Sequence, residues 1–392
     1  MLKVVKYCKE YSIPLILGVV VSVIWANTAP ESYETFVYTP IAGETISLHM
    51  IINDVFMVFF FAIAGVEIIN SMGKGGALNP VKKAVTPLLA TVGGVVIPIA
   101  VFFVLNAVMG SPEYANGWGI CTATDIAMAW LFAKLIFGKN HPAISFLLLL
   151  AVVDDAIGLV IIAVFYPAPG EQVQPQWLLL VAAAMLLAWG FRKIKIRYFE
   201  PYVLICGTIS WIGMHQAHLH PALALVFIIP FLPRTGRTSY SEDEHGVDHA
   251  AGKSALHTFE TRVGTMVDFG MFFFGLTNAG VGFSSVSGLT LIIFLAFLIG
   301  KSLGVCLFTF LAVKLKAQLP QGMKWKDVLV TGVIAGMGLT VALFITENAF
   351  TSAVLQGAAK MGALCTVFIL PVAFVLSKAV GVQRINEKND GQ

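Results

Sequence analysis

Two adjacent aspartates, Asp154 and Asp155, lie in the middle of a long apolar stretch, residues 143–166. Apart from these two and a closing tyrosine, the stretch has no ionisable side chain, and its length predicts a membrane-spanning helix. One aspartate at the centre of such a helix costs about 2.5–3.5 kcal/mol on insertion scales. Because ionisable groups in membrane spans usually face a cavity and mark an ion or proton path, the pair predicts such a path.

The composition favours an all-α polytopic membrane protein. Of the 392 residues, 57% are hydrophobic and 12% are charged, and the mean hydropathy of +0.83 excludes an ordinary soluble domain. The net charge of +3 comes from scattered basic residues and gives no indication of nucleic-acid binding. The five cysteines are isolated and fit neither a disulfide framework nor a CxxC metal site. We expect a single integral membrane domain over residues 1–392.

Hydropathy predicts about twelve spans. The first could also be a signal peptide, but we interpret it as a retained span because the chain stays in the membrane afterwards. Lys and Arg are concentrated in alternate loops, so the positive-inside rule places both termini in the cytoplasm. The predicted spans are residues 13–26, 50–72, 85–108, 117–137, 143–166, 177–189, 201–214, 219–231, 267–283, 289–315, 328–346 and 358–380.

The segment between the first two spans has a different character. Residues 30–49 include three glutamates and no Lys or Arg, which is typical of an outer loop. Residues 36–48 alternate in a way that predicts two short strands around an Ala-Gly turn. We therefore expect a small β-hairpin on the outer face.

Two predicted spans are interrupted by glycines. Residues 117–127 contain two glycines, two threonines and Asp125, and residues 331–340 contain three glycines and two threonines. Irregular backbone at membrane depth is tolerated only where it lines a cavity or is buried in protein. Breaks at corresponding places in two halves of a chain indicate an inverted-repeat transporter with its site where the breaks meet. The alternative is that these glycines only allow close helix packing.

Several of these motifs in combination resemble one family. The chain carries Thr124-Asp125, Asp154-Asp155, Lys301 within Ile299-Gly300-Lys301-Ser302-Leu303-Gly304, Asn278-Ala279-Gly280 and Gly336-Met337-Gly338-Leu339-Thr340, and in these it resembles the NhaA family of bacterial sodium/proton antiporters from the first span to the last. The resemblance implies twelve spans, with the fourth and eleventh unwound and crossing near the midplane. It also implies an inner-membrane homodimer paired through the hairpin that starts at Tyr38 and ends at Leu48.

The resemblance also implies roles for particular residues. Asp155 matches the principal Na⁺- and Li⁺-binding carboxylate, and Asp154 matches the aspartate that pairs with the lysine at Lys301. Thr124 and Asp125 match the group between two facing positive helix ends. The residue types suit these roles, because a hard monovalent cation prefers oxygen ligands and adjacent helical residues point about 100° apart. A purely structural salt bridge is the alternative for Lys301.

The sequence also contains candidate pH-response residues. Glu67 matches a family glutamate near the cytoplasmic funnel, but Asn70 and Ser71 stand where the family has a basic-acidic pair. His220 matches a family histidine, or it belongs with neighbouring histidines to a polar helix end. Asp54 and Asp268 we regard as secondary, since helix-end hydrogen bonds would explain either. The long loop from Arg234 to Arg262 contains Glu260, a further candidate for the pH response. It also contains His245 and His249, whose spacing suits either a metal or a solvated acidic loop.

We expect secondary exchange of cytoplasmic Na⁺ or Li⁺ for external protons, without ATP or any cofactor. The chain contains no GxxxxGK[ST] phosphate-binding loop. Burial generally raises carboxylate pKa values, so protons and cations can compete for the same oxygens while access alternates. A sodium-coupled organic anion symporter of similar architecture is the alternative, and it predicts a larger polar cavity. An intramembrane aspartyl protease is disfavoured, because no Gly-x-Gly-Asp segment occurs and we expect no enzyme activity.

Overall fold

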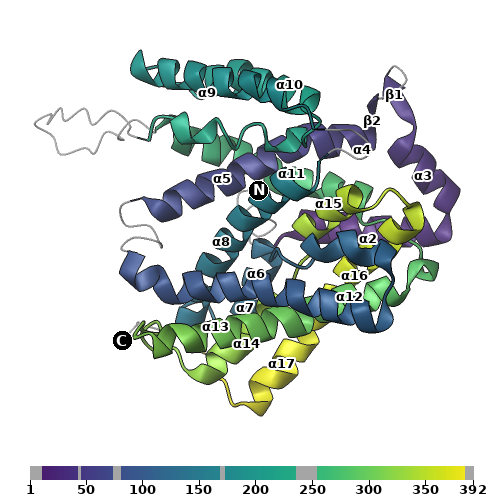
Figure 1. Ribbon diagram of the computed structural model, residues 1–392, viewed down its shortest axis with the longest axis vertical. Coiled ribbons are helices and arrows are strands. Elements are labelled where there is room, and N and C mark those ends of the chain that lie inside the picture. The colour runs from purple at the N-terminus through teal and green to yellow at the C-terminus, as the bar shows by residue number, and fades with distance from the viewer. Residues whose placement is uncertain (1–10, 43–45, 74–80, 168–172, 235–253, 385–392) are drawn as a thin grey trace, which may run out of the picture.

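The computed structural model describes residues 11–42, 46–73, 81–167, 173–234 and 254–384. Its long helices run side by side across the view of Figure 1, with α9 and α10 forming one outer layer and α17 lying at the opposite side. Among the described residues, six helices are long and apolar enough to cross a membrane, or seven if one bent pair counts as a single span. The all-α polytopic fold is thus confirmed, and the number of twelve spans stays a prediction.

The first half of the chain contains the outer hairpin and the first interrupted helix. The hairpin is confirmed as two antiparallel strands, with Pro40 opposite Ser47; its tip, residues 43–45, lies outside the described residues. The elements are α2 Ile13–Thr28, α3 Pro30–Tyr38, β1 Pro40–Ala42, β2 Ile46–Ser47, α4 Leu48–Met50, η1 Ile51–Phe56, α5 Met57–Met72, α6 Val81–Met109, η2 Pro112–Gly119, α7 Ile126–Phe137 and α8 Pro142–Phe165.

The second half repeats the pattern of long helices with one interruption. Helices α14 and α15 are separated by four residues and bend by 45°. The elements are η3 Pro175–Trp177, α9 Leu178–Lys193, η4 Tyr202–Gly207, α10 Thr208–Gln216, η5 Pro221–Leu223, η6 Ile229–Phe231, α11 Ala255–Asn278, η7 Phe283–Ser285, α12 Gly288–Leu295, η8 Ala296–Lys301, α13 Ser302–Lys314, α14 Trp325–Ala335, α15 Thr340–Ala349, α16 Ala353–Cys365, η9 Thr366–Phe368 and α17 Ile369–Ala379.

Two local predictions were wrong. Residues 219–231 form consecutive short turns, including the 3₁₀ segments η5 and η6, and no α-helix. Pro221 and Pro230 lack the amide hydrogen that a continuous helix needs, and the apolar side chains of this segment are mostly buried in protein. Residues 36–38, predicted as strand, are the last turn of α3, which starts at Pro30, a favourable first helical residue.

The core of the fold depends on close helix contacts. Helix α13 packs along α6, and α2 packs along α11. At the first contact Gly93 and Gly304 face each other so closely that a Cβ on Gly304 would lie 2.2 Å from the Gly93 carbonyl oxygen. Only glycine fits there, as the close-packing interpretation of small residues predicts. This contact brings the helix that carries Lys301 against the centre of the bundle.

Candidate functional site

The two interrupted helices meet at their breaks. The Asp125 amide donates a hydrogen bond of 2.7 Å to the Met337 carbonyl oxygen, which joins the break before α7 to the break before α15. Next to it, the Thr124 hydroxyl lies 2.7 Å from the Ala335 carbonyl oxygen at the end of α14. A Cβ on Gly338 would lie 2.2 Å from the Phe297 ring, so the break before α15 needs glycine at this position for its backbone to pack against Phe297. Irregular backbone is therefore enclosed by protein, as membrane depth requires.

Asp125 lies between two helix N-termini. Its Oδ1 accepts a hydrogen bond of 3.0 Å from the Met128 amide in the first turn of α7. Its Oδ2 accepts one of 3.2 Å from the Thr340 amide, the first residue of α15. Each helix N-terminus carries a partial charge of about +0.5, so one carboxylate here offsets two positive helix ends at once. The side chain is 4% exposed.

Lys301 forms a fully buried ion pair with Asp154. Its Nζ lies 2.6 Å from Asp154 Oδ2 and donates to the Thr122 carbonyl oxygen at 2.5 Å. The Thr124 hydroxyl contacts the same Asp154 oxygen at 2.7 Å. Lys301 is the last residue of the π-helical turn η8, and such turns frequently occur at functional sites. The lysine charge is thus satisfied by a carboxylate and by the carbonyl group of a broken helix.

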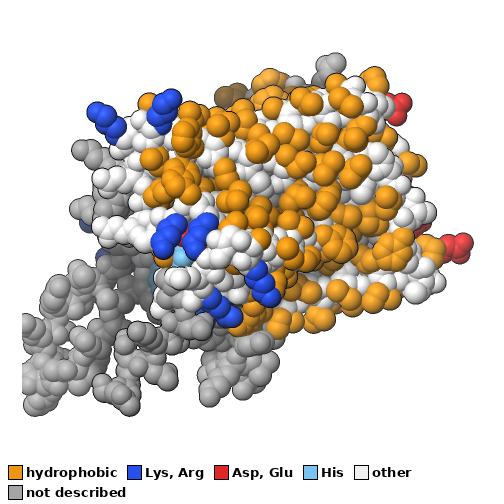
Figure 2. Space-filling view, turned by 90° about the horizontal axis from the view of Figure 1, so that it is seen from below, with side chains coloured by type: hydrophobic (Ala, Val, Ile, Leu, Met, Phe, Trp, Pro, Cys, Tyr) orange, Lys and Arg blue, Asp and Glu red, His pale blue; other side chains and the backbone are white. Residues whose placement is uncertain are grey.

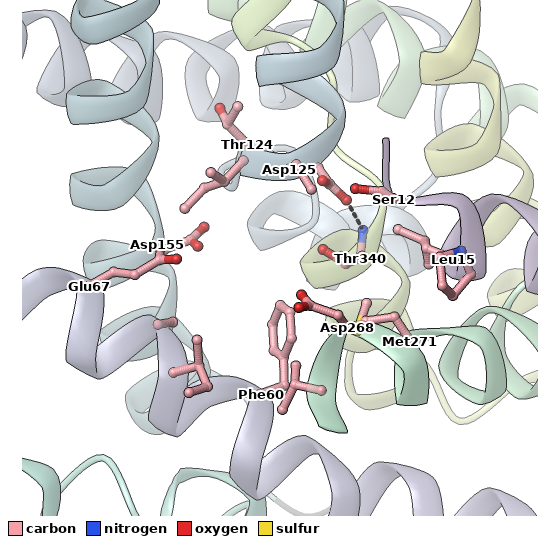
Figure 3. A pocket seen from close by; sticks show the side chains of 16 residues that line it. Ser12, Leu15, Phe60, Glu67, Thr124, Asp125, Asp155, Asp268, Met271 and Thr340 are labelled. Carbon is pink, nitrogen blue, oxygen red and sulfur yellow. Dashed lines mark hydrogen bonds between the residues drawn. The ribbon is translucent and has the colours of Figure 1, made fainter. Parts of the chain in front are cut away.

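Asp155, unlike Asp154, lines a cavity of about 160 Å³, and its side chain is shown in Figure 3. Its side chain is 9% exposed, and its Oδ1 has no hydrogen-bond partner among the described residues. Four acidic residues and no basic residue line the described part of the cavity, which is enclosed by α2, α5, α8, α11 and the two breaks. The acidic residues are Glu67, Asp125, Asp155 and Asp268.

This arrangement suits a small cation. Carboxylate and hydroxyl oxygens are the ligands that hard monovalent cations prefer, and the cavity offers both, with Thr124 and Thr340 among its lining residues. An unpartnered carboxylate oxygen buried in a low-dielectric environment is costly unless a proton or a cation neutralises it. Asp155 therefore provides an atom at which either can bind.

The predicted pH-response residues lie at three different places. Glu67 lines the site cavity, beside Asp155 (Figure 3). Glu260 lies outside it near the start of α11, where its Oε2 accepts a hydrogen bond of 3.3 Å from Asn70. His220 is in a second cavity of about 440 Å³, and its ring centroid lies 4.5 Å from that of Phe344. His245 and His249 lie outside the described residues.

Sequence reasoning missed a second buried ion pair. Lys360, in α16, contacts Glu347 in α15, and His49 Nε2 lies 3.6 Å from the same carboxylate. Glu347 and His49 also line the second cavity. The sequence contained a signal, because Lys360 is a base near the start of a predicted apolar span and breaks the alternation of basic loops. In the structure its side chain is 5% exposed. A buried lysine requires a counter-charge, and the nearest acid in the preceding helix would have been the candidate.

Comparison with known proteins identifies the relatives of this chain. Residues 3–377 match the model of the family described as Na+/H+ antiporter 1. The chain is 52% identical to the Na(+)/H(+) antiporter NhaA of Desulfitobacterium hafniense (strain DSM 10664 / DCB-2), with 98% of each chain covered. It is also 52% identical to the NhaA of Geotalea uraniireducens (strain Rf4), again with 98% of each covered.

A solved structure shares the fold. The chain superposes on the sodium proton antiporter MjNhaP1 from Methanocaldococcus jannaschii with a TM-score of 0.51. The match covers 95% of this chain and 90% of the other, at 14% sequence identity. Such a low identity supports a common fold and no transfer of individual residues.

Proposed function

The chain belongs to the Na+/H+ antiporter 1 family, and from this membership we propose that it exchanges Na⁺ or Li⁺ for protons at Asp155. The observation that carries the assignment is the unpartnered Asp155 oxygen in a cavity lined by acids. One proton or one cation binds there, and neither binds well while the other is present. Access to the cavity then alternates between the two faces of the membrane as one part of the helix bundle rocks against another.

The other charged groups hold this site together. Asp154 neutralises Lys301, so the lysine does not repel the cation at Asp155. Asp125 offsets the two helix N-termini, and Thr124 connects the Asp154 carboxylate to the end of α14. Together these contacts link the ion site to both broken helices, whose ends are the elements that a change of access would move.

The surface supports an orientation in the bacterial inner membrane. Figure 2 shows a broad apolar belt, with Lys and Arg side chains gathered at one end and Asp and Glu side chains at the other. In Figure 1 the chain's C-terminal end lies at one end of the long helices and the β1–β2 hairpin at the other. By the positive-inside rule the basic end is cytoplasmic and the hairpin is external, and the alternation of basic loops in the sequence supports a cytoplasmic position for both termini.

The hairpin is our proposed dimer contact. Ile41 and Ile46 are 68% and 39% exposed, although both are large apolar residues outside the long helices. An edge strand with unpaired backbone groups is a favourable place for a second copy to add its own strand. The segment from Tyr38 to Leu48 therefore has the chemistry that an interface between two copies requires.

Cavity size and charge disfavour the alternative of an organic anion symporter. A cavity of about 160 Å³ lined by four acidic residues repels an organic anion and accommodates a cation. The two functions are separated with purified protein in liposomes that hold an imposed proton gradient. Antiport collapses the gradient when Na⁺ alone is added, whereas a symporter needs its anion as well.

The placement of Asp125 predicts unequal effects of two substitutions. Asp125→Asn should reduce the rate of Na⁺-dependent proton flux by about tenfold or more, because charge interactions with partly buried helix ends reach about 2 kcal/mol. Asp125→Glu keeps the charge and should lose less. Flux in proteoliposomes at saturating Na⁺ measures both. Equal and mild losses would show that the carboxylate charge does not matter at this position.

Competition at one carboxylate also predicts how Na⁺ changes the pH profile. Activity should rise with pH, because protons then leave the site and the cation can bind. A tenfold rise in Na⁺ should move the half-activation pH downward by up to about one unit, as mass action for one proton at a shared site requires. Initial proton flux at several fixed Na⁺ concentrations tests this. A midpoint that does not respond to Na⁺ would place the pH response elsewhere in the chain.

A further inference from the structure

The cavity at Asp155 is lined by a further acidic residue that has no role in the proposed exchange. Asp268, on α11, lines the same cavity, together with its helix neighbours Val267 and Met271. In Figure 3 its carboxylate lies beside the Phe60 ring and extends toward the side of the cavity where Asp155 and Glu67 lie. Asp155 and Asp268 therefore lie on opposite sides of one cavity.

An aspartate at this point of α11 requires a reason. The five residues before it and the ten after it, up to Asn278, contain no other ionisable side chain. A carboxylate at such depth is costly, and those that occur in membrane spans usually face a cavity on an ion path. In the sequence, helix-end hydrogen bonding was the simpler explanation, but Asp268 is ten residues from the end of α11 at Asn278 and thirteen from its start at Ala255.

An independent observation shows that this cavity is built for a ligand. The Oδ1 atom of Asp155 is buried and without a hydrogen-bond partner among the described residues, and the Asp155 side chain lines the cavity that Asp268 also lines. No Lys, Arg or His is among the described residues around that space. A low-dielectric cleft lined by charges of one sign concentrates counter-ions, which raises association rates.

We propose that Asp268 is a second carboxylate of the cation path, which holds the cation in the cavity before transfer to Asp155 and so sets the apparent affinity for Na⁺. This inference rests on the proposed function, because it assumes that Asp155 is the exchange site. Asp268 acts through electrostatic attraction and does not itself exchange the proton. Its removal therefore changes the Na⁺ concentration needed for half-maximal flux and leaves the maximal rate nearly intact.

The test is the Na⁺ dependence of proton flux in proteoliposomes at fixed alkaline pH. Asp268→Asn should raise the half-saturating Na⁺ concentration about three- to tenfold, as expected for the loss of one focusing charge, with a maximal rate within about twofold. Asp268→Glu should restore most of the affinity. The matched control is Glu200→Gln, which removes one negative charge from an exposed side chain paired with Arg262 outside the cavity. It should leave both parameters unchanged.

The outcomes separate this inference from the proposed function. If Asp155→Asn abolishes exchange while Asp268→Asn and Asp268→Ser both keep the normal half-saturating concentration, the role of Asp268 is wrong and the site at Asp155 stands. If Asp155→Asn exchanges normally, the proposed function fails first. Asp268→Ser also removes the charge, so a folding failure of the asparagine variant leaves the test intact. A loss of maximal rate without a change in half-saturation would likewise overturn the inference.

Discussion

Replacing Asp155 with asparagine will abolish Na⁺-dependent proton exchange while the protein still inserts and folds. The substitution preserves the shape of the side chain and removes its charge, and no hydrogen bond is lost at Oδ1, which has no partner among the described residues. Removing one member of a buried charged contact costs about 3–5 kcal/mol, which corresponds to a loss of cation affinity of at least ~100-fold.

The measurement is Na⁺- and Li⁺-dependent proton flux in proteoliposomes across pH. A suitable control is Asp54→Asn. It makes the same chemical change in a predicted span, but Asp54 lines the second cavity and not the cavity at Asp155. The control should retain exchange, and both variants should elute and melt like the parent protein in detergent. Exchange at the parental rate in Asp155→Asn would remove Asp155 from the mechanism.

The effects on stability of changing Asp154 and Lys301 will not be additive, because the two residues form one ion pair. Either single change, Asp154→Asn or Lys301→Gln, leaves a buried charge without its partner and should destabilise the protein by about 3–5 kcal/mol. The double substitution removes both charges and should recover much of the loss. The reason is the geometry, since both side chains are almost wholly buried and 2.6 Å apart.

Thermal melting of the four proteins in detergent forms a double-mutant cycle that measures this coupling. A matched control combines Asp154→Asn with Lys360→Gln, because Lys360 is an equally buried lysine with a different partner, Glu347. In the control the two losses should add. If the Asp154–Lys301 double variant is no more stable than the worse single variant, the two charges do not depend on each other.

Much of the fold was predictable because its determinants are local. Long apolar runs predict helices, and each of the six described helices that could span a membrane by length and composition closely overlaps a predicted span. The two interruptions were predictable from glycine and threonine at membrane depth, and the hairpin from alternation around Ala42 and Gly43. Where local signals conflicted, prediction failed: residues 219–231 are apolar enough for a span, but prolines and burial in protein favour short turns.

The sequence by itself determined which residues bear charge at membrane depth, and therefore that Asp125, Asp154, Asp155 and Lys301 needed partners or a ligand. Only the tertiary structure decided which of these residues pair with each other and which one lines the cavity. Helix geometry predicts that adjacent aspartates face different directions, but not which of them meets Lys301, which is 147 residues away from Asp154 in the chain. That choice depends on the contact at Gly93 and Gly304 and on the π-helical turn ending at Lys301, which together place the lysine against Asp154. Because Asp154 pairs with Lys301, Asp155 lines the cavity without an ion-pair partner of its own among the described residues. Long-range packing decides this division, since no local sequence preference does.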